Sequence, residues 1–348
     1  MPWPHNGHET VEQRNTVPVD VGTAVGTLRV EIRKAVDLYC SEPDFREAIF
    51  RALCRPGFAL HPQAPCRAGI LTLEVCRAIS RPPGVAAMQA AVAVEFHMQA
   101  AYLFDNVADR DKSPSDDLTS AEELAVAIGL LSCGQSALYE AAFAAGRHGA
   151  GLLSLLRWAG DCAVKCCTGQ FLDAYLEKQT VVTTEESLKM TSLKAGSIGR
   201  FAAGLGASMA TGDPDIVNLS GEFGFNLFTY LQLVDDLRDA CKAQDLQGDL
   251  MQHKKTLPLV FFQNSLTESN PEVDCCIIPP EDSQEAKADG CRRFESSGSR
   301  VFGAIAAEAF LNRAKSNLAG IRSRVGTVDN LERIVGSLEI TPQEVVSS

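Results

Sequence analysis

Two groups of aspartates stand at the ends of apolar stretches of this sequence. In the first, "LFDNVAD", Asp105 and Asp109 are four residues apart, so both would point from one face of a helix. Met98 and Ala101 precede them on that face and are apolar. In the second group, "YLQLVDDLRDA", one helical stripe carries Phe228, Gln232, Asp235 and Asp239, with Asp236 beside it.

This arrangement indicates a metal-binding site. A single pair of acids at this spacing is common on a solvated helix face, but two groups that each end an apolar stripe are harder to explain in that way. Carboxylates at the mouth of an apolar cavity repel one another and are costly to desolvate without cations. Mg²⁺ resolves this conflict because it binds a few carboxylates together with substrate phosphates. The pattern therefore predicts Mg²⁺ and a diphosphate leaving group above an apolar pocket.

The composition and charge of the chain argue against several classes of function. The chain has 348 residues, is 45% hydrophobic and carries a formal net charge of −12, which argues against nucleic acid or an anionic membrane surface as the main partner. Twelve cysteines lie at irregular positions without a CxxC pair, and the first residues do not resemble a signal peptide. No stretch is predicted to span a membrane, since residues such as Glu95 and His97 interrupt the longest apolar runs. We therefore expect a cytoplasmic protein with reduced thiols.

Helical periodicity extends through most of the chain. Apolar residues recur at i, i+3, i+4 and i+7, and almost no stretch alternates as a strand would. We expect an all-α protein with a flexible arm over residues 1–20, a single domain over 21–340, a polar insertion at about 265–298 that is expected to be mobile, and a tail over 341–348. Helices are expected at about 26–40, 68–79, 86–109, 120–146, 151–179, 184–210, which Thr184 would cap, and 222–242.

Five segments together resemble the trans-isoprenyl diphosphate synthase (polyprenyl synthetase) family, which has the class I isoprenoid synthase fold, a helical bundle around a central cavity. "DNVAD" at Asp105–Asp109 is similar to the first aspartate motif of the family, and "DDLRD" at Asp235–Asp239 is similar to the second. "HKKTLPLV", with Lys254, is similar to a Gly-Lys-Thr-Leu-Pro stretch, and "GQFLDA" and "SLKAGS" are similar to two further segments. The order and spacing of these pieces carry the resemblance, which extends from about residue 21 to 336.

The resemblance implies a site for an allylic prenyl diphosphate and Mg²⁺. Lysines and metal would stabilise the departing diphosphate while an allylic cation forms. Asn106 stands where the family has a second aspartate; it offers a carbonyl oxygen without charge, so we expect weaker metal binding there. The implied metal ligands are Asp105, Asn106, Asp109, Asp235, Asp236 and Asp239, and catalysis is expected to depend on Asp105, Asp109, Asp235 and Asp239. The implied substrate contacts are Lys194, Gln232, Lys254, Arg67, Phe228 and Ala101.

The residues with which the family holds a second substrate, isopentenyl diphosphate, are largely replaced. Ala64 and Pro65 stand where a Gly-Lys-Arg segment has its lysine and first arginine, and only Arg67 remains. Met98 stands at the position of a histidine, and Pro114–Ser115 at that of an arginine pair. Each charge-assisted contact contributes about 1.5–3 kcal/mol, so a second diphosphate is expected to bind weakly.

We therefore expect a terpene synthase that ionises a C15 or C20 substrate, farnesyl or geranylgeranyl diphosphate, and then cyclises the cation or eliminates a proton. Ala100 and Ala101 leave pocket depth for such a chain, and the Phe228 ring is placed to shield a cation. The alternative is a chain-elongating polyprenyl or geranylgeranyl-type diphosphate synthase or another prenyltransferase. A third class, a non-catalytic partner subunit of a prenyl synthase, has no need of the intact "DDLRD" and "KKTLPL". The family also leads us to expect a homodimer.

Overall fold

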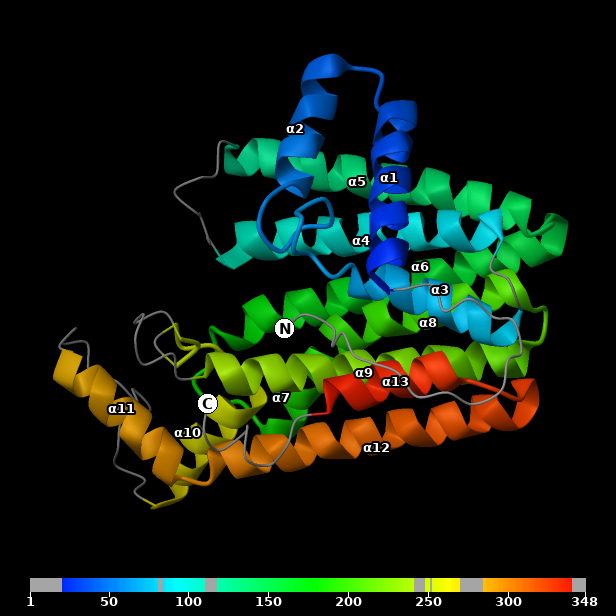
Figure 1. Cartoon of the computed structure of the whole chain (residues 1–348). Coiled ribbons are helices and arrows are strands. Elements are labelled where there is room, and N and C mark those ends of the chain that lie inside the picture. Colours follow the sequence, from blue (N-terminus) through cyan, green and yellow to red (C-terminus); the bar gives the residue numbers. More distant parts are fainter. Residues whose placement is uncertain are drawn as a thin grey trace. The chain divides into compact units, whose positions relative to one another are not determined.

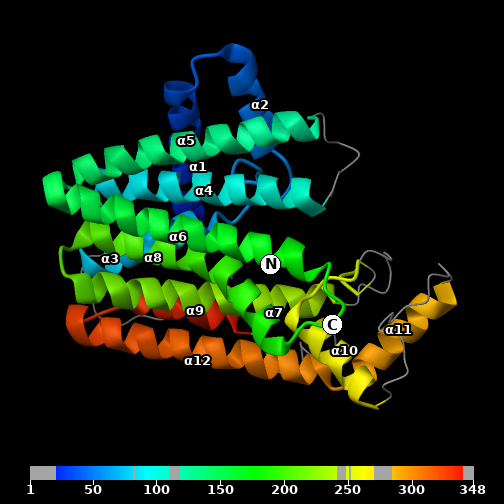
Figure 2. The same cartoon turned by 180° about the vertical axis from the view of Figure 1, so that it is seen from behind.

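The computed structural model describes residues 21–80, 84–109, 118–240, 248–250, 252–269 and 284–339, and all regular structure in these ranges is helical (Figures 1 and 2). The all-α prediction is therefore confirmed for this part of the chain. The elements are α1 (Val21–Tyr39), α2 (Pro43–Leu53), α3 (Arg67–Ile79), α4 (Val85–Asp109), α5 (Ser120–Ala144), α6 (Gly149–Leu176), α7 (Thr184–Thr191), the π-helical η1 (Ser192–Gly196), α8 (Ser197–Ala210), α9 (Pro214–Asp239), α10 (Leu257–Ser269), α11 (Gln284–Ser296), α12 (Ser299–Val325) and α13 (Asp329–Leu338).

Each stretch that the sequence predicted as helical contains a helix, but several ends differ. The N-cap of α7 is Thr183, one residue before the predicted Thr184, because Thr183 and Glu186 form a reciprocal capping box. Within the insertion expected at about 265–298, α10 extends to Ser269 and α11 covers Gln284–Ser296; the mobility of this insertion stays a prediction. The expected arm (1–20) and tail (341–348), like residues 270–283, lie outside the described residues.

Contacts along the chain define two compact units, which are described separately. Unit 1 comprises residues 1–159, 201–221 and 321–337, and unit 2 comprises residues 160–200, 222–320 and 338–348. The single domain expected over residues 21–340 stays a prediction.

In unit 1, α4 and α5 lie side by side along their length (Figures 1 and 2). Small side chains make this close packing possible. Residues 90–94 of α4, "AAVAV", are fully buried, and so are Ala127, Ala137 and Ala141 of α5. At Gly134 of α5 a Cβ would lie only 2.6 Å from Nδ1 of His97 on α4. The packed pair thus supports the last turns of α4, where Asp105 lies.

A buried carboxyl group joins α4 to the start of α3. Glu95 is 1% exposed, and its Oε1 accepts a hydrogen bond of 2.7 Å from the backbone N–H of Gly69 in the first turn of α3. Gln99 donates to Oε2 of Glu95 at 3.3 Å and accepts from the backbone N–H of Ala59 at 3.0 Å. Burial raises the pKa of Glu95 to about 7, while the hydrogen bonds from Gly69 and Gln99 act in the opposite direction. This network holds the backbone around the first turn of α3, which begins at Arg67.

We expect the stability of the protein to fall as pH rises from about 4.5 to 7 through Glu95. The folded state keeps the proton on this carboxyl group up to a pKa of about 7, whereas the unfolded state releases it near 4.5. Between these values the folded state binds more protons, so the free energy of unfolding decreases with pH, by about 3 kcal/mol in total, and levels off above pH 7. Urea unfolding at pH 5 and pH 8 should show this loss, and Glu95→Gln should remove it. The exposed Glu47→Gln is the matched control, and an equal slope in wild type and Glu95→Gln would contradict the assignment.

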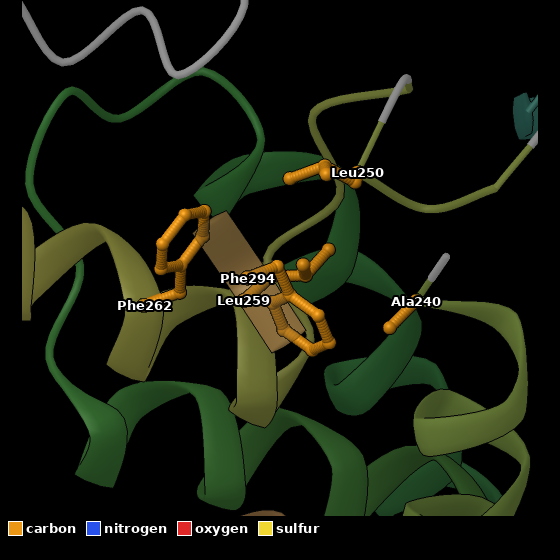
Figure 3. Close-up of a cluster of buried hydrophobic side chains, with 5 residues drawn as sticks. All are labelled: Ala240, Leu250, Leu259, Phe262 and Phe294. Carbon is orange, nitrogen blue, oxygen red and sulfur yellow. The ribbon is translucent and has the colours of Figure 1, made fainter. Parts of the chain in front are cut away.

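Unit 2 contains a buried apolar cluster at the C-terminal end of α9 (Figure 3). Its members come from α10, α11, the residue after α9 and the following loop: Ala240, Leu250, Leu259, Phe262 and Phe294. The rings of Phe262 and Phe294 meet edge to face with centroids 5.6 Å apart. Because Ala240 directly follows the "DDLRD" stretch, this cluster anchors the end of the helix that carries the second group of acids.

One helix of the described residues is long and apolar enough to cross a membrane by length and composition alone, and the absence of a membrane span stays a prediction. This helix is α5, Ser120–Ala144, with a mean hydropathy of 1.3 over its most apolar 18 residues and 44% of that window buried. The core helix of a soluble protein passes the same test, so the finding is weak evidence for a membrane span.

Candidate active site

The last turns of α9 present the second group of acids in unit 2. Asp235 is about half exposed, and its Oδ1 lies 3.5 Å from Nη1 of Arg238, an exposed pair that contributes little to stability. Asp236 is 5% exposed, and its Oδ1 accepts a hydrogen bond of 2.9 Å from Gln232. Burial raises the pKa of Asp236 well above its usual range, the charges of Asp249, Asp235 and Asp173 raise it further, and the Gln232 hydrogen bond opposes them. These carboxyl groups therefore form a strongly anionic environment.

A lysine in the π-helical turn of unit 2 is paired with Asp173, one of the acids whose charge acts on Asp236. Lys194 lies at the centre of η1, and its Nζ donates a hydrogen bond of 2.6 Å to Oδ2 of Asp173 on α6. Both side chains are largely buried, with 22% and 11% exposure. The two backbones approach closely because residue 169 is glycine: a Cβ there would lie 2.2 Å from the backbone nitrogen of Lys194. A π-helical turn in this position is typical of functional sites.

A second lysine is paired with an acid directly after α6. Nζ of Lys254 lies 2.8 Å from Oε1 of Glu177, with 14% and 33% exposure of the two side chains. Glu177 is the first residue after α6 and follows Asp173 by four residues, and its backbone N–H donates a hydrogen bond of 3.2 Å to the carbonyl of Asp173. Within unit 2 the structure therefore places two ammonium groups on two carboxylates at the C-terminal end of α6.

Phe228 of α9 lies in the core of unit 2 and is 6% exposed. A Cβ at Gly199 of α8 would lie 2.1 Å from the carbonyl oxygen of Gly224 and 2.6 Å from Cβ of Phe228, so α8 and α9 cross in close contact at this ring. The position is consistent with core packing as well as with the predicted shielding of a cation.

The predicted residues of unit 1 lie on α3 and α4. Asp105, Asn106 and Ala101 are half-buried in the last turns of α4, and Arg67 is half-buried in the first turn of α3. Asp109 is the last residue of α4, and its side chain lies outside the described residues.

The donor groups present suit Mg²⁺ only in part. Aspartates and the carbonyl oxygen of Asn106 are hard oxygen ligands of the kind that Mg²⁺ prefers. Among the described residues, no three His, Cys, Asp or Glu side chains are arranged so that they could hold a metal ion by themselves. The carboxylates in unit 2 therefore fit an ion that takes most of its other ligands from water and a diphosphate.

The comparisons with known proteins decide the family. A model of the polyprenyl synthetase family matches residues 66–292, which is more than half of the 348 residues. This chain belongs to the polyprenyl synthetase family.

Relatives and solved structures agree with this assignment. The geranylgeranyl diphosphate synthase of Mycobacterium tuberculosis is 33% identical over 119 residues, 33% of this chain and 34% of that protein. A short chain isoprenyl diphosphate synthase of Methanothermobacter thermautotrophicus is 26% identical over 260 residues, 71% of this chain and 78% of that protein. The polyprenyl synthase of Caulobacter crescentus CB15, solved with calcium and isoprenyl diphosphate, has a TM-score of 0.74 at 17% identity, covering 94% of this chain and 97% of that one. The class I isoprenoid synthase fold is thereby confirmed.

Two positions in or beside the segments that resemble the family have a distinct local structure. His253, directly before "KKTLP", has φ 56°, a left-handed conformation that glycine adopts without cost and histidine only uncommonly. Ala64 stands at the lysine of the Gly-Lys-Arg segment, is 5% exposed, and accepts a hydrogen bond of 2.5 Å from Arg29 through its carbonyl oxygen. Of the other substituted positions, Met98 is half-buried on α4, and 114–115 lie outside the described residues.

Three acids of the candidate site were not singled out by the sequence analysis. Asp173 lies within the recognised "GQFLDA" segment, but its role depends on the contact with Lys194, which no sequence spacing shows. The four-residue spacing to Glu177 was a usable signal that was overlooked. Asp249 acts on Asp236 from the loop after α9, and its backbone N–H donates a hydrogen bond of 3.0 Å to the carbonyl of Asp239.

Proposed function

We propose that this protein is a Mg²⁺-dependent prenyltransferase that elongates an allylic prenyl diphosphate with isopentenyl diphosphate. The family assignment supports this proposal, as do the relatives, which are named as prenyl diphosphate synthases. These findings favour the alternative of the sequence analysis over the terpene synthase that was expected first.

The observation that carries the proposal is the pair of held lysines in unit 2. Lys194 and Lys254 are fixed by Asp173 and Glu177 at 2.6 and 2.8 Å. Such fixed ammonium groups bind a leaving diphosphate without reorganisation during the reaction. In the free protein the carboxylates neutralise them, and a diphosphate would compete for the same N–H donors.

The chemistry assigns a role to each group. Mg²⁺, when bound, would withdraw charge from the diphosphate. In unit 2 its proposed ligands are Asp235, Asp236 and Asp239, and in unit 1 the resemblance separately proposes Asp105, Asn106 and Asp109 as ligands. The C–O bond of the allylic substrate breaks, and its electron pair leaves with the diphosphate, which Lys194, Lys254 and Gln232 bind. The double bond of isopentenyl diphosphate then supplies the electrons of the new C–C bond, and a proton is lost from the neighbouring carbon.

Terpene synthase chemistry is the second candidate, because one specific observation favours it. The cations that would hold a second diphosphate are missing at Ala64, Pro65 and Met98, which leaves Arg67 from that set. Ala64 is buried and its segment is held by Arg29, so a small shift would not open a replacement site there. In this case the cation from farnesyl or geranylgeranyl diphosphate would be quenched by its own double bonds, followed by loss of a proton or capture of water.

Product analysis separates the candidates. The purified protein is incubated with Mg²⁺ and geranyl, farnesyl or geranylgeranyl diphosphate, with and without isopentenyl diphosphate, and extracts are analysed by gas chromatography–mass spectrometry after dephosphorylation. Elongation predicts longer prenyl alcohols only in the paired incubations. A hydrocarbon or cyclic alcohol from one substrate alone would support the second candidate instead. No product from folded protein under any condition would contradict both and leave the non-catalytic subunit.

We also propose a homodimer through α5 and the start of α6 in unit 1. A stripe of exposed apolar side chains follows one face of α5, with Ile128 at 58%, Tyr139 at 48% and Phe143 at 70% exposure, and Leu153 of α6 is also exposed. Exposed apolar side chains gathered in this way mark an association surface. Sedimentation equilibrium should give twice the mass of one chain, and Ile128→Glu together with Phe143→Glu should give the monomer.

A further inference from the structure

A buried arginine from α12 contacts the second aspartate motif without being part of it. Arg300 is the second residue of α12 and is 6% exposed. Its Nη1 donates a hydrogen bond of 2.9 Å to the carbonyl oxygen of Leu237, the residue at the centre of "DDLRD". The carbonyl groups in the last turn of a helix have no partner within the helix, so this bond supplies one from outside.

The arginine is itself fixed from two sides. Its Nε lies 2.7 and 2.6 Å from the two carboxylate oxygens of Glu295 at the end of α11. Its guanidinium group also lies over the ring of Phe294, 5.7 Å from the centroid. Phe294 belongs to the apolar cluster of Figure 3, so Arg300 is attached to the same cluster that encloses Ala240.

The backbone of α12 is close to α9 at the same point. A Cβ at Gly303 would lie 2.8 Å from Cδ2 of Leu237, so a larger residue there would require the Leu237 side chain to shift. Two further carbonyl groups at the end of the motif are bound by the loop: Asp239, the last residue of the motif, accepts from the N–H of Asp249 at 3.0 Å, and Ala240, which follows it, accepts from that of Leu250 at 3.3 Å. The end of α9 is therefore fixed by α12 on Leu237 and by the loop on Asp239 and Ala240.

We propose that Arg300 is a positioning residue for the metal-binding aspartates of α9. Its cation lies at the negative end of the α9 dipole, where positive charge is favourable. Through Leu237 it fixes the backbone of the turn from which Asp235, Asp236 and Asp239 project, so these carboxylates are oriented before a metal arrives. The proposal rests on the proposed function in one respect, namely that these aspartates bind the metal.

The test compares three variants. Arg300→Met keeps the length and the contact with Phe294 but removes the donors, and Arg300→Lys keeps the charge with a single donor group. Arg292→Met is the matched control, because Arg292 is an exposed arginine of α11 paired only with Asp289 in the described contacts. Thermal unfolding is measured for all three, and if Arg300→Met does not fold, Arg300→Lys and Glu295→Gln take its place.

Two readouts do not require turnover. We expect Mn²⁺, titrated with inorganic pyrophosphate present and followed by electron paramagnetic resonance, to bind at least 10-fold more weakly to Arg300→Met, with partial recovery in Arg300→Lys. The amide hydrogens of Asp249 and Leu250 should also exchange faster in Arg300→Met.

A folded Arg300→Met with unchanged Mn²⁺ affinity would overturn the proposal, even if its melting temperature fell. If wild type bound Mn²⁺ but showed no turnover, the proposed function would fail while this proposal stood.

Discussion

Asp235→Ala should reduce turnover by about 10³-fold under saturating Mg²⁺. The reason is common to both candidate reactions: each begins with loss of diphosphate, and the charge on that group must be neutralised as the bond breaks. A metal ion supplies several kcal/mol of this stabilisation, and about 4 kcal/mol corresponds to a factor of 10³. Release of pyrophosphate from a prenyl diphosphate, measured with a coupled assay, checks the prediction.

The control for this variant must change charge without touching the site. Asp161→Ala serves, because Asp161 is an exposed acid of α6 that pairs with Lys165 in unit 2. It should stay within twofold of wild type. Asp105→Ala in unit 1 should match the loss seen for Asp235→Ala. Wild-type rates in a folded Asp235→Ala protein would show that the metal assignment in α9 is wrong.

The helices could be predicted well from the sequence because a helix with one buried face has apolar residues at every third or fourth position. The Ala- and Val-rich core of α4 and the stripe from Phe228 to Asp239 are both visible as spacing alone. The insertion expected at about 265–298 stays a prediction as a whole, although residues 284–296 of it form α11. In the described part of α11, Phe294 is completely buried and Cys291 packs against the same apolar cluster, and these contacts anchor a mostly polar helix.

What spacing could not predict was contact between distant segments. Thr184–Ala210 was expected as one helix, yet residues 192–196 form a π-helical turn where Gly169 lets α6 approach the backbone of Lys194. The pairing of Lys194 with Asp173 follows from the same approach, whereas Lys254 reaches Glu177 from the segment before α10. The hydrogen bond from Arg300 to the carbonyl oxygen of Leu237 joins residues that are 63 positions apart, so no local sequence pattern indicates it.

Lys194→Met should lower kcat/KM for the allylic substrate by about 10²-fold. A charge-assisted hydrogen bond to a buried phosphate oxygen contributes about 1.5–3 kcal/mol, which corresponds to about 10- to 150-fold. The matched control is Lys165→Met, which removes an exposed lysine from an i,i+4 pair on α6 and should change the rate less than twofold. Steady-state kinetics at fixed Mg²⁺ measures both.

Asp173→Asn tests whether catalysis needs only the positive charge of Lys194 or also the position in which the Asp173 carboxylate holds it. It keeps the Lys194 ammonium group but replaces the carboxylate, 2.6 Å away, that fixes it in the π-helical turn. If the carboxylate serves to place the ammonium group for the departing diphosphate, kcat should fall by about 10-fold with little change in KM, since the interaction is needed most in the transition state. If the pair only holds α6 to η1, the variant should lose thermal stability and keep its kcat. A rise in affinity for inorganic pyrophosphate with unchanged kcat would show instead that Asp173 competes with the ligand for Lys194, and the placing role would then be wrong.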